Sequence, residues 1–69
     1  MENQIYLYRT IKNMSLRQLS AKTGISYSYL GKLERGESIP SLLKAYKISY
    51  VFKMPVEKIF ENPFYSHNN

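Results

Sequence analysis

The stretch Ser15–Gly36, with the sequence SLRQLSAKTGISYSYLGKLERG, decides the fold of this chain. It predicts two short helices joined by a tight turn at Gly24, because glycine readily takes the left-handed conformation in which many helices end. Ser15 is a good N-cap for the first helix, and Gln18 stands at the position that completes a capping box. This first helix is therefore expected to run to about Thr23.

The second helix of the pair is expected over about residues 27–34, capped by Ser26. Leu30 and Leu33 would point into the core. The residues left on its outer face are Tyr27, Ser28, Gly31 and Lys32. A glycine in mid-helix costs up to about 1 kcal/mol relative to alanine. Two explanations stay open for Gly31: close approach of a partner, or simple tolerance.

Capping residues and apolar patterns on either side of this pair predict three more helices. They are a helix of about residues 4–13 capped by Asn3, one of about 41–53 capped by Ser41, and one of about 55–60 beginning at Pro55. The inner positions of the fourth helix would be Leu42, Ala45, Ile48, Ser49 and Phe52, with Tyr46 beside them. Ser20 is expected to bond back to the carbonyl of Leu16. The sequence thus predicts a compact, all-α, five-helix fold.

Length and composition restrict what the chain can be. Its 69 residues predict one domain, taken as residues 1–61, followed by a C-terminal tail of residues 62–69. There is no cysteine, the single histidine (His67) cannot form a metal cluster alone, and no paired carboxylates or glycine-rich phosphate loop point to an enzyme. No apolar run approaches the roughly 20 residues of a membrane span, and no signal peptide is visible. We expect a cytoplasmic protein without metal or cofactor.

Positive charge gathers on the helix pair. The formal net charge is +5, and residues 14–36 contribute +3 of it, from four cations against the single carboxylate of Glu34. Such a concentration of charge suits a polyanionic partner such as nucleic acid. Ordinary solvated lysines explain the charge alone equally well.

Several short motifs lie within and around the two helices at characteristic spacing. They are Arg9, Met14-Ser15, Leu19-Ser20, Gly24-Ile25-Ser26, Leu33-Glu34-Arg35-Gly36, Pro40-Ser41 and Ile59-Phe60. In this register, over about residues 5–60, the chain resembles the lambda-repressor/Cro-like (XRE) family of helix-turn-helix proteins. It departs from the family at Leu16, where many members have a glutamine that contacts phosphate. The resemblance implies a five-helix domain that reads operator DNA.

The resemblance also implies roles for individual side chains. The helix of residues 27–34 would be the recognition helix, with its N-terminal residues in the major groove of double-stranded DNA. Base edges would be read by Tyr27, Ser28 and Lys32. The DNA backbone would be held by Arg17, Tyr29, Arg35, Ser38, Ser41 and Lys44. The family's ion pair between the first and third helices would join Arg9 to Glu34, as a structural pair and not a DNA contact.

A homodimer on DNA is expected, because the core is small and related domains often pair near their C-terminal ends. The residues assigned to dimer or tail packing are Leu7, Ile11, Phe60, Phe64 and Tyr65. Leu7 and Ile11 form an apolar stripe with no place in the core, and the tail either folds back onto it or crosses to the other subunit. The favoured function is a repressor-like, sequence-specific transcription regulator with no small-molecule ligand. The alternative is a protein-interaction module, such as an antitoxin or anti-repressor, on the same fold.

Overall fold

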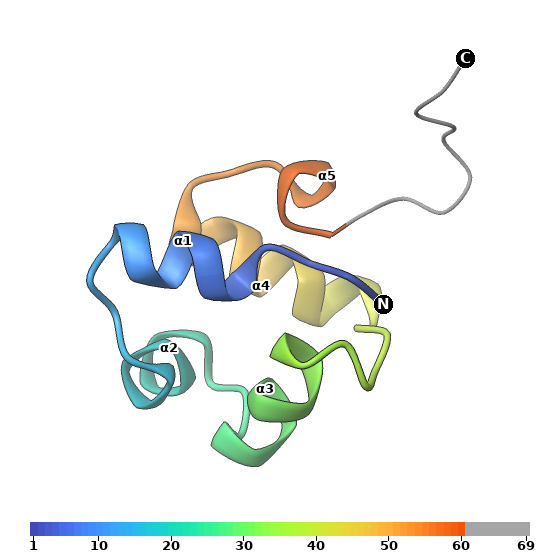
Figure 1. Ribbon diagram of the computed structural model, residues 1–69, viewed down its shortest axis with the longest axis horizontal. Coiled ribbons are helices and arrows are strands. Elements are labelled where there is room, and N and C mark those ends of the chain that lie inside the picture. Colours follow the sequence, from blue (N-terminus) through green and yellow to red (C-terminus); the bar gives the residue numbers. More distant parts are fainter. Residues whose placement is uncertain (61–69) are drawn as a thin grey trace.

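The computed structural model describes residues 1–60. The helices are α1 (Ile5–Ile11), α2 (Leu16–Thr23), α3 (Tyr27–Glu34), α4 (Leu42–Phe52) and α5 (Val56–Ile59). Figure 1 shows α1 and α4 in the middle, α2 and α3 on one side of them and α5 on the other. No strand occurs in residues 1–60, so the predicted all-α, five-helix fold is confirmed. α1 is shorter than the range 4–13 expected for it, because the chain turns at Asn13, which has a φ of +55°.

Capping side chains fix where the central helices begin. Ser15 Oγ accepts a hydrogen bond from the Gln18 N–H (3.0 Å), and Gln18 Oε1 accepts one from the Ser15 N–H (2.7 Å), so the predicted capping box is present. Ser26 and Ser41 cap α3 and α4 through their side-chain oxygens. Gly24 ends α2 with a φ of +74°, in the expected left-handed conformation. The caps and the glycine together set α2 and α3 as a helix-turn-helix.

Two hydroxyl groups tie the end of α2 to the turn that follows it. Ser20 Oγ donates to the carbonyl of Ile25 at 2.6 Å, so the predicted bond to the Leu16 carbonyl is wrong. Thr23 Oγ1 donates to the carbonyl of Leu19 at 2.8 Å and accepts from the Ile25 N–H at 3.2 Å. The reason for the difference is that the glycine turn folds Ile25 back against α2, where its carbonyl would otherwise lack a donor.

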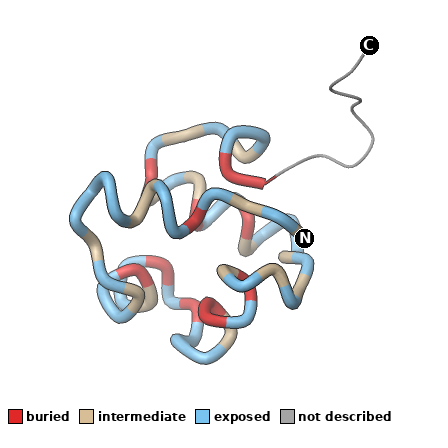
Figure 2. Tube along the Cα trace, in the orientation of Figure 1, coloured by how far each residue is buried: buried red, intermediate tan, exposed pale blue. Residues whose placement is uncertain are grey.

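The core is formed by the inner faces of all five helices, which Figure 2 shows as buried segments turned toward one another. Its members are Ile5, Leu19, Ile25, Leu30, Leu33, Ala45, Ile48, Phe52, Ile59 and Phe60. Leu30 and Leu33 are fully buried, as predicted for the inner side of α3. Half-buried Tyr8 of α1 packs against Phe52 of α4, with 6.1 Å between the ring centroids.

The predicted inner face of α4 is partly wrong. Leu42 and Tyr46 are 66% and 56% exposed, whereas Ala45, Ile48 and Phe52 are buried. Residues in a helix are about 100° apart, so the three buried positions share an arc of about 60°. Tyr46 lies about 100° around the helix from Ala45, and Leu42 about 60° on that same side, which places both beyond the arc that meets the core.

The two ends of the described chain meet beside α1. The Gln4 N–H donates to the carbonyl of Ile59 at 2.7 Å, and Asn3 pairs with Phe60 in an isolated antiparallel bridge. This bridge carries Phe60 into the core, where it is only 5% exposed, so its expected place on a dimer surface is wrong. Phe64 and Tyr65, expected in the same surface, lie outside the described residues.

Candidate nucleic-acid interface

The outer face of α3 presents polar side chains to solvent. Tyr27, Ser28 and Lys32 are all exposed, and Ser28 and Lys32 lie one turn apart on the same side of the helix. A lysine ammonium donates well to guanine O6 and N7, and a serine hydroxyl can both donate to and accept from base edges. This side of α3 therefore offers exposed hydrogen-bonding groups to a partner.

Gly31, expected on that same outer face, is buried. A Cβ built on it would lie 3.2 Å from Arg35 Nη1 and 3.8 Å from Leu16 Cδ2. The chain's own side chains cover the glycine, which gives an explanation within the fold beside the two left open by the sequence. Its absent side chain makes room for the Arg35 guanidinium across the end of α3 and for Leu16 of α2.

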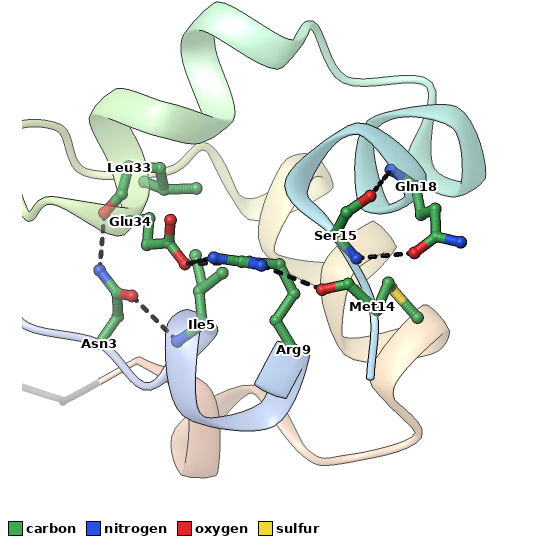
Figure 3. A network of polar contacts seen from close by, with 8 residues as sticks. All are labelled: Asn3, Ile5, Arg9, Met14, Ser15, Gln18, Leu33 and Glu34. Atoms are coloured by element: carbon green, nitrogen blue, oxygen red, sulfur yellow. Dashed lines mark hydrogen bonds and ion pairs between the residues drawn. The ribbon is translucent and has the colours of Figure 1, made fainter. Parts of the chain in front are cut away.

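An ion pair locks α1 to the end of α3, and Figure 3 shows its geometry. Arg9 donates to Glu34 Oε2 from Nε (3.0 Å) and Nη2 (2.8 Å), and from Nη1 to the carbonyl of Met14 (3.0 Å). The side chains of Arg9 and Glu34 are only 15% and 16% exposed. The Arg9 guanidinium makes three hydrogen bonds in a site that is largely shielded from water. These bonds fix the angle between α1 and α3. The pair therefore orients α3 against α1, and both of its side chains are largely shielded from solvent.

Two cations flank α3, each resting on a tyrosine ring of that helix. The Arg17 guanidinium of α2 lies 4.5 Å from the ring centroid of Tyr27, and Lys44 Nζ of α4 lies 4.5 Å from that of Tyr29. Cation–π contacts of this length hold a charged group in place without neutralising it. Arg17 and Lys44 thus keep their positive charges beside the exposed face of α3. The sequence alone did not reveal this support, because the partners are distant along the chain.

Arg35 is engaged within the chain. Its Nε lies 2.8 Å from Glu37 Oε2, in a pair whose side chains are 59% and 53% exposed. The hydrogen bond from Arg35 lowers the pKa of Glu37, and the same bond raises the pKa of Arg35. Glu37 is absent from the residues predicted for the site, although a carboxylate two residues after a predicted phosphate ligand indicates competition for that ligand. Any phosphate bound by Arg35 must displace Glu37 from the guanidinium or share the guanidinium with that carboxylate.

The remaining backbone candidates lie at the start of α4. Ser38 is half-buried, and Ser41 is exposed with its Oγ accepting from the Lys44 N–H at 3.2 Å. The Ser41 hydroxyl hydrogen stays available to a phosphate oxygen. In residues 1–60, no three histidine, cysteine or carboxylate side chains gather as metal ligands would. None of the described helices is long and apolar enough to cross a membrane.

The fold and the exposed α3 face define a helix-turn-helix domain, and comparison with known proteins agrees. The family model HTH_3, helix-turn-helix, matches residues 5–59, so the chain belongs to this XRE-type helix-turn-helix family. An uncharacterised HTH-type transcriptional regulator of Methanocaldococcus jannaschii is 35% identical over 60 residues, covering 87% of this chain and 91% of the relative. The family consists of DNA-binding transcription regulators and is not an enzyme family.

Two solved structures share the fold. The restriction-modification controller protein C.AhdI of Aeromonas hydrophila matches with a TM-score of 0.77 and 28% identity, over 83% of this chain and 86% of that chain. A chain of the complex between the SinR and SinI proteins matches with a TM-score of 0.79 and 32% identity, over 88% of this chain and 60% of that chain. The lambda-repressor-like architecture expected from the sequence is therefore confirmed.

Proposed function

We propose that this protein is a sequence-specific regulator of transcription that reads double-stranded DNA with α3. The observation that carries the proposal is the exposed face of Tyr27, Ser28 and Lys32 between two cations held on tyrosine rings. Lys32 and Ser28 meet base edges in the major groove, and Arg17 and Lys44 bind phosphates on either side. Tyr27 adds an apolar ring edge that fits a thymine methyl group, while it also holds Arg17.

Regulation follows from occupancy of the operator. On this proposal the protein acts by where it binds on DNA. A bound dimer blocks polymerase in the manner of a repressor. The fold shared with a restriction-modification controller protein is consistent with control of a small operon. Backbone contacts supply affinity that falls with salt, and base contacts supply the choice of site.

The decisive experiment is selection of bound sites from random duplex DNA, made with the parent chain and with variants. We expect the parent to enrich a palindromic site, and Lys32→Ala to change the preferred base at one position of each half-site, because one good base contact gives roughly 1–3 kcal/mol of discrimination. Lys44→Ala should weaken binding to all sequences about equally. Lys12→Ala, an exposed change of the same charge on the α1 side, is the control. An unaltered site with Lys32→Ala would refute the assignment of the reading face.

A second expectation concerns the carboxylate of Glu37. Glu37→Gln should strengthen binding to duplex DNA at low salt, because it releases Arg35 for a phosphate and removes a negative charge beside the interface. One more neutralised phosphate should steepen the slope of log K against log salt by about 0.9. Glu57→Gln on α5 changes the net charge equally and serves as the control. Equal effects of the two variants would mean that only net charge matters.

We propose further that the protein binds DNA as a homodimer paired through the start of α4. Ile39, Leu42 and Leu43 are 72%, 66% and 64% exposed, directly after α3 in the chain and among the phosphate candidates. Exposed aliphatic side chains gathered in this way are typical of a protein contact. Because these residues follow α3 directly, we expect pairing here to leave both recognition helices on one side of the dimer, as successive major grooves require.

The apolar stripe of α1 is less suited to this pairing. Leu7 and Ile11 each lie two residues from Arg9, and therefore about 160° around the helix from it. Because Arg9 binds Glu34 of α3, the stripe faces away from the recognition helix. A two-fold contact through α1 would turn the two α3 helices outward on opposite sides. The stripe remains exposed, and it supplies a matched control for the α4 surface.

The protein-interaction alternative has one observation in its favour: a fold-related chain was solved as part of the SinR–SinI complex. Salt-dependent duplex binding by the isolated chain supports the regulator. Tight binding of a protein partner, with no affinity for any duplex selected from a random pool, would support the interaction module in its place.

A further inference from the structure

An open groove lies between the end of α2 and the C-terminal half of α4, apart from the exposed face of α3. It consists of two adjoining hollows of about 650 and 340 Å³ that share Lys22, Tyr50 and Val51. The first hollow continues to Met54 and Pro55, and the second reaches Tyr46 and Lys47. None of these residues belongs to the predicted DNA-binding set, and DNA reading by α3 uses none of them.

The lining of the groove combines an apolar floor with a cationic rim. Val51 and Met54 are half-buried at its base. Tyr46 and Tyr50 stand at its edge, and Tyr50 is 84% exposed, the most exposed of the large apolar and aromatic side chains in residues 1–60. The charged residues of the lining are Lys22, Lys47 and Lys53, all exposed and with no carboxylate among their neighbours in the lining. Exposed aromatic rings beside an apolar floor are the usual anchors of protein contacts.

Lys53 occupies a backbone position that glycine would favour. It follows α4 with a φ of +57°, in the left-handed region, and its N–H donates to the Ser49 carbonyl. A side chain at such a helix end costs stability relative to glycine, which is why glycine dominates there. A residue kept in an unfavourable conformation points to a use for its side chain. The side chain of Lys53 lines the groove.

The charge of the groove indicates what can occupy it. A second copy of this chain, paired through a two-fold axis, would set three lysines against the same three lysines. Phosphates of nucleic acid would satisfy the lysines but would leave the floor of Val51 and Met54 without an apolar partner. A helix with an apolar stripe and acidic flanks would pair with the lysines and also cover the apolar floor, since a groove between two helices accepts the apolar face of a third.

We propose that this groove binds an acidic amphipathic helix of another protein, independently of DNA.

The test is selection of displayed random peptides of about 16 residues, long enough for four helical turns, on the immobilised full chain. We expect enriched peptides to carry apolar residues at helical spacing together with aspartate and glutamate. Their affinity for Lys22→Gln/Lys47→Gln should fall by more than about threefold and by up to about 30-fold, since two screened ion pairs of an exposed surface are lost. Lys12→Gln/Lys58→Gln removes the same charge elsewhere on the exposed surface and should change the affinity less than about twofold.

Several outcomes would overturn the proposal. Enriched peptides that are neutral or basic, or that bind the groove variant as well as the parent, would show that the lysines do not select the ligand. A fall in sedimenting mass with the groove variant would assign the groove to a second copy of the chain. Loss of duplex affinity beyond that of the Lys12/Lys58 control would assign it to DNA. The DNA-reading proposal survives each of the first two results, because it rests on α3.

Lys53 provides a variant whose two effects have opposite signs. Lys53→Gly should raise the melting temperature, because glycine adopts the left-handed conformation without strain. The same change should weaken binding of the selected acidic peptides by about two- to fivefold, because one of three exposed cations is lost. A more stable variant that binds these peptides as tightly as the parent would refute the role of Lys53, and with it the explanation of its conformation.

Discussion

Replacing Glu34 by alanine is expected to lower the free energy of unfolding by about 3 kcal/mol, the lower end of the range for breaking a buried ion pair. The side chains of Arg9 and Glu34 are 15% and 16% exposed, so the guanidinium left behind has little water to replace its partner. Three of its donors are committed in the native structure, two of them to Glu34. For a domain of this size the melting temperature should fall by roughly 12–24 °C. Thermal and urea denaturation followed by circular dichroism measure both quantities.

The matched control is Glu37→Ala, which removes the carboxylate of the exposed pair with Arg35. Because that pair is more than half exposed on both sides, solvent replaces the lost contact and the melting temperature should stay close to that of the parent. The two variants remove the same charge within three residues of each other. A Glu34→Ala melting temperature equal to that of the parent would show that the Arg9 pair does not hold α1 against α3.

Local chemistry made much of this fold predictable. The capping box of Ser15 and Gln18 and the glycine turn at Gly24 depend on residues within a few positions of one another, and all were identified correctly. The Arg9–Glu34 pair is distant in sequence, and it was expected only through the family resemblance; the structure contains it. The positions whose burial was predicted wrongly are those at which packing between distant parts of the chain decides exposure.

Three such positions show why sequence was insufficient. Gly31 was placed outside by helix periodicity, but the long side chain of Arg35 folds across it and buries it. Leu42 was placed inside by the same periodicity, yet the arc of α4 that meets the core is too narrow to include it. Phe60 was assigned to a dimer surface because related domains often pair near their C-terminal ends, whereas its bridge with Asn3 draws it inward. Leu42 lies at the edge of a buried face, where a small rotation reverses exposure, whereas Gly31 and Phe60 are buried by contacts that helix periodicity does not include.

The candidate site follows the same division. Exposure of Tyr27, Ser28 and Lys32 follows from the amphipathic pattern of α3 and was predicted. The contacts of Arg17 with Tyr27 and of Lys44 with Tyr29 join separate helices, and only the structure reveals them. Each contact holds a cation of a neighbouring helix beside α3.

The dimer proposal gives the second large effect. Leu42→Glu/Leu43→Glu should lower affinity for a duplex with two half-sites by about 100-fold or more, because linked half-sites gain about 10² or more over single ones. Affinity for a single half-site should change much less, although the added carboxylates near the interface will weaken it somewhat. The control is Leu7→Glu/Ile11→Glu, the same substitutions on the exposed stripe of α1. Titration of both duplexes, with half-site centres one helical turn or roughly 34 Å apart, makes the comparison.

The pattern of losses identifies the contact, because each variant removes one candidate surface and leaves the core intact. A loss confined to the two-half-site duplex with the α4 variant supports pairing beside the DNA. The same loss with the α1 variant would mean that the two chains pair through the apolar stripe of α1 and not through the start of α4. A chain ending at Glu61 tests the segment expected to include Phe64 and Tyr65: if this truncation removes the preference for two half-sites while the α4 variant keeps it, pairing through α4 is wrong and the tail forms the dimer. If all three variants behave as the parent does, the chain binds each half-site alone.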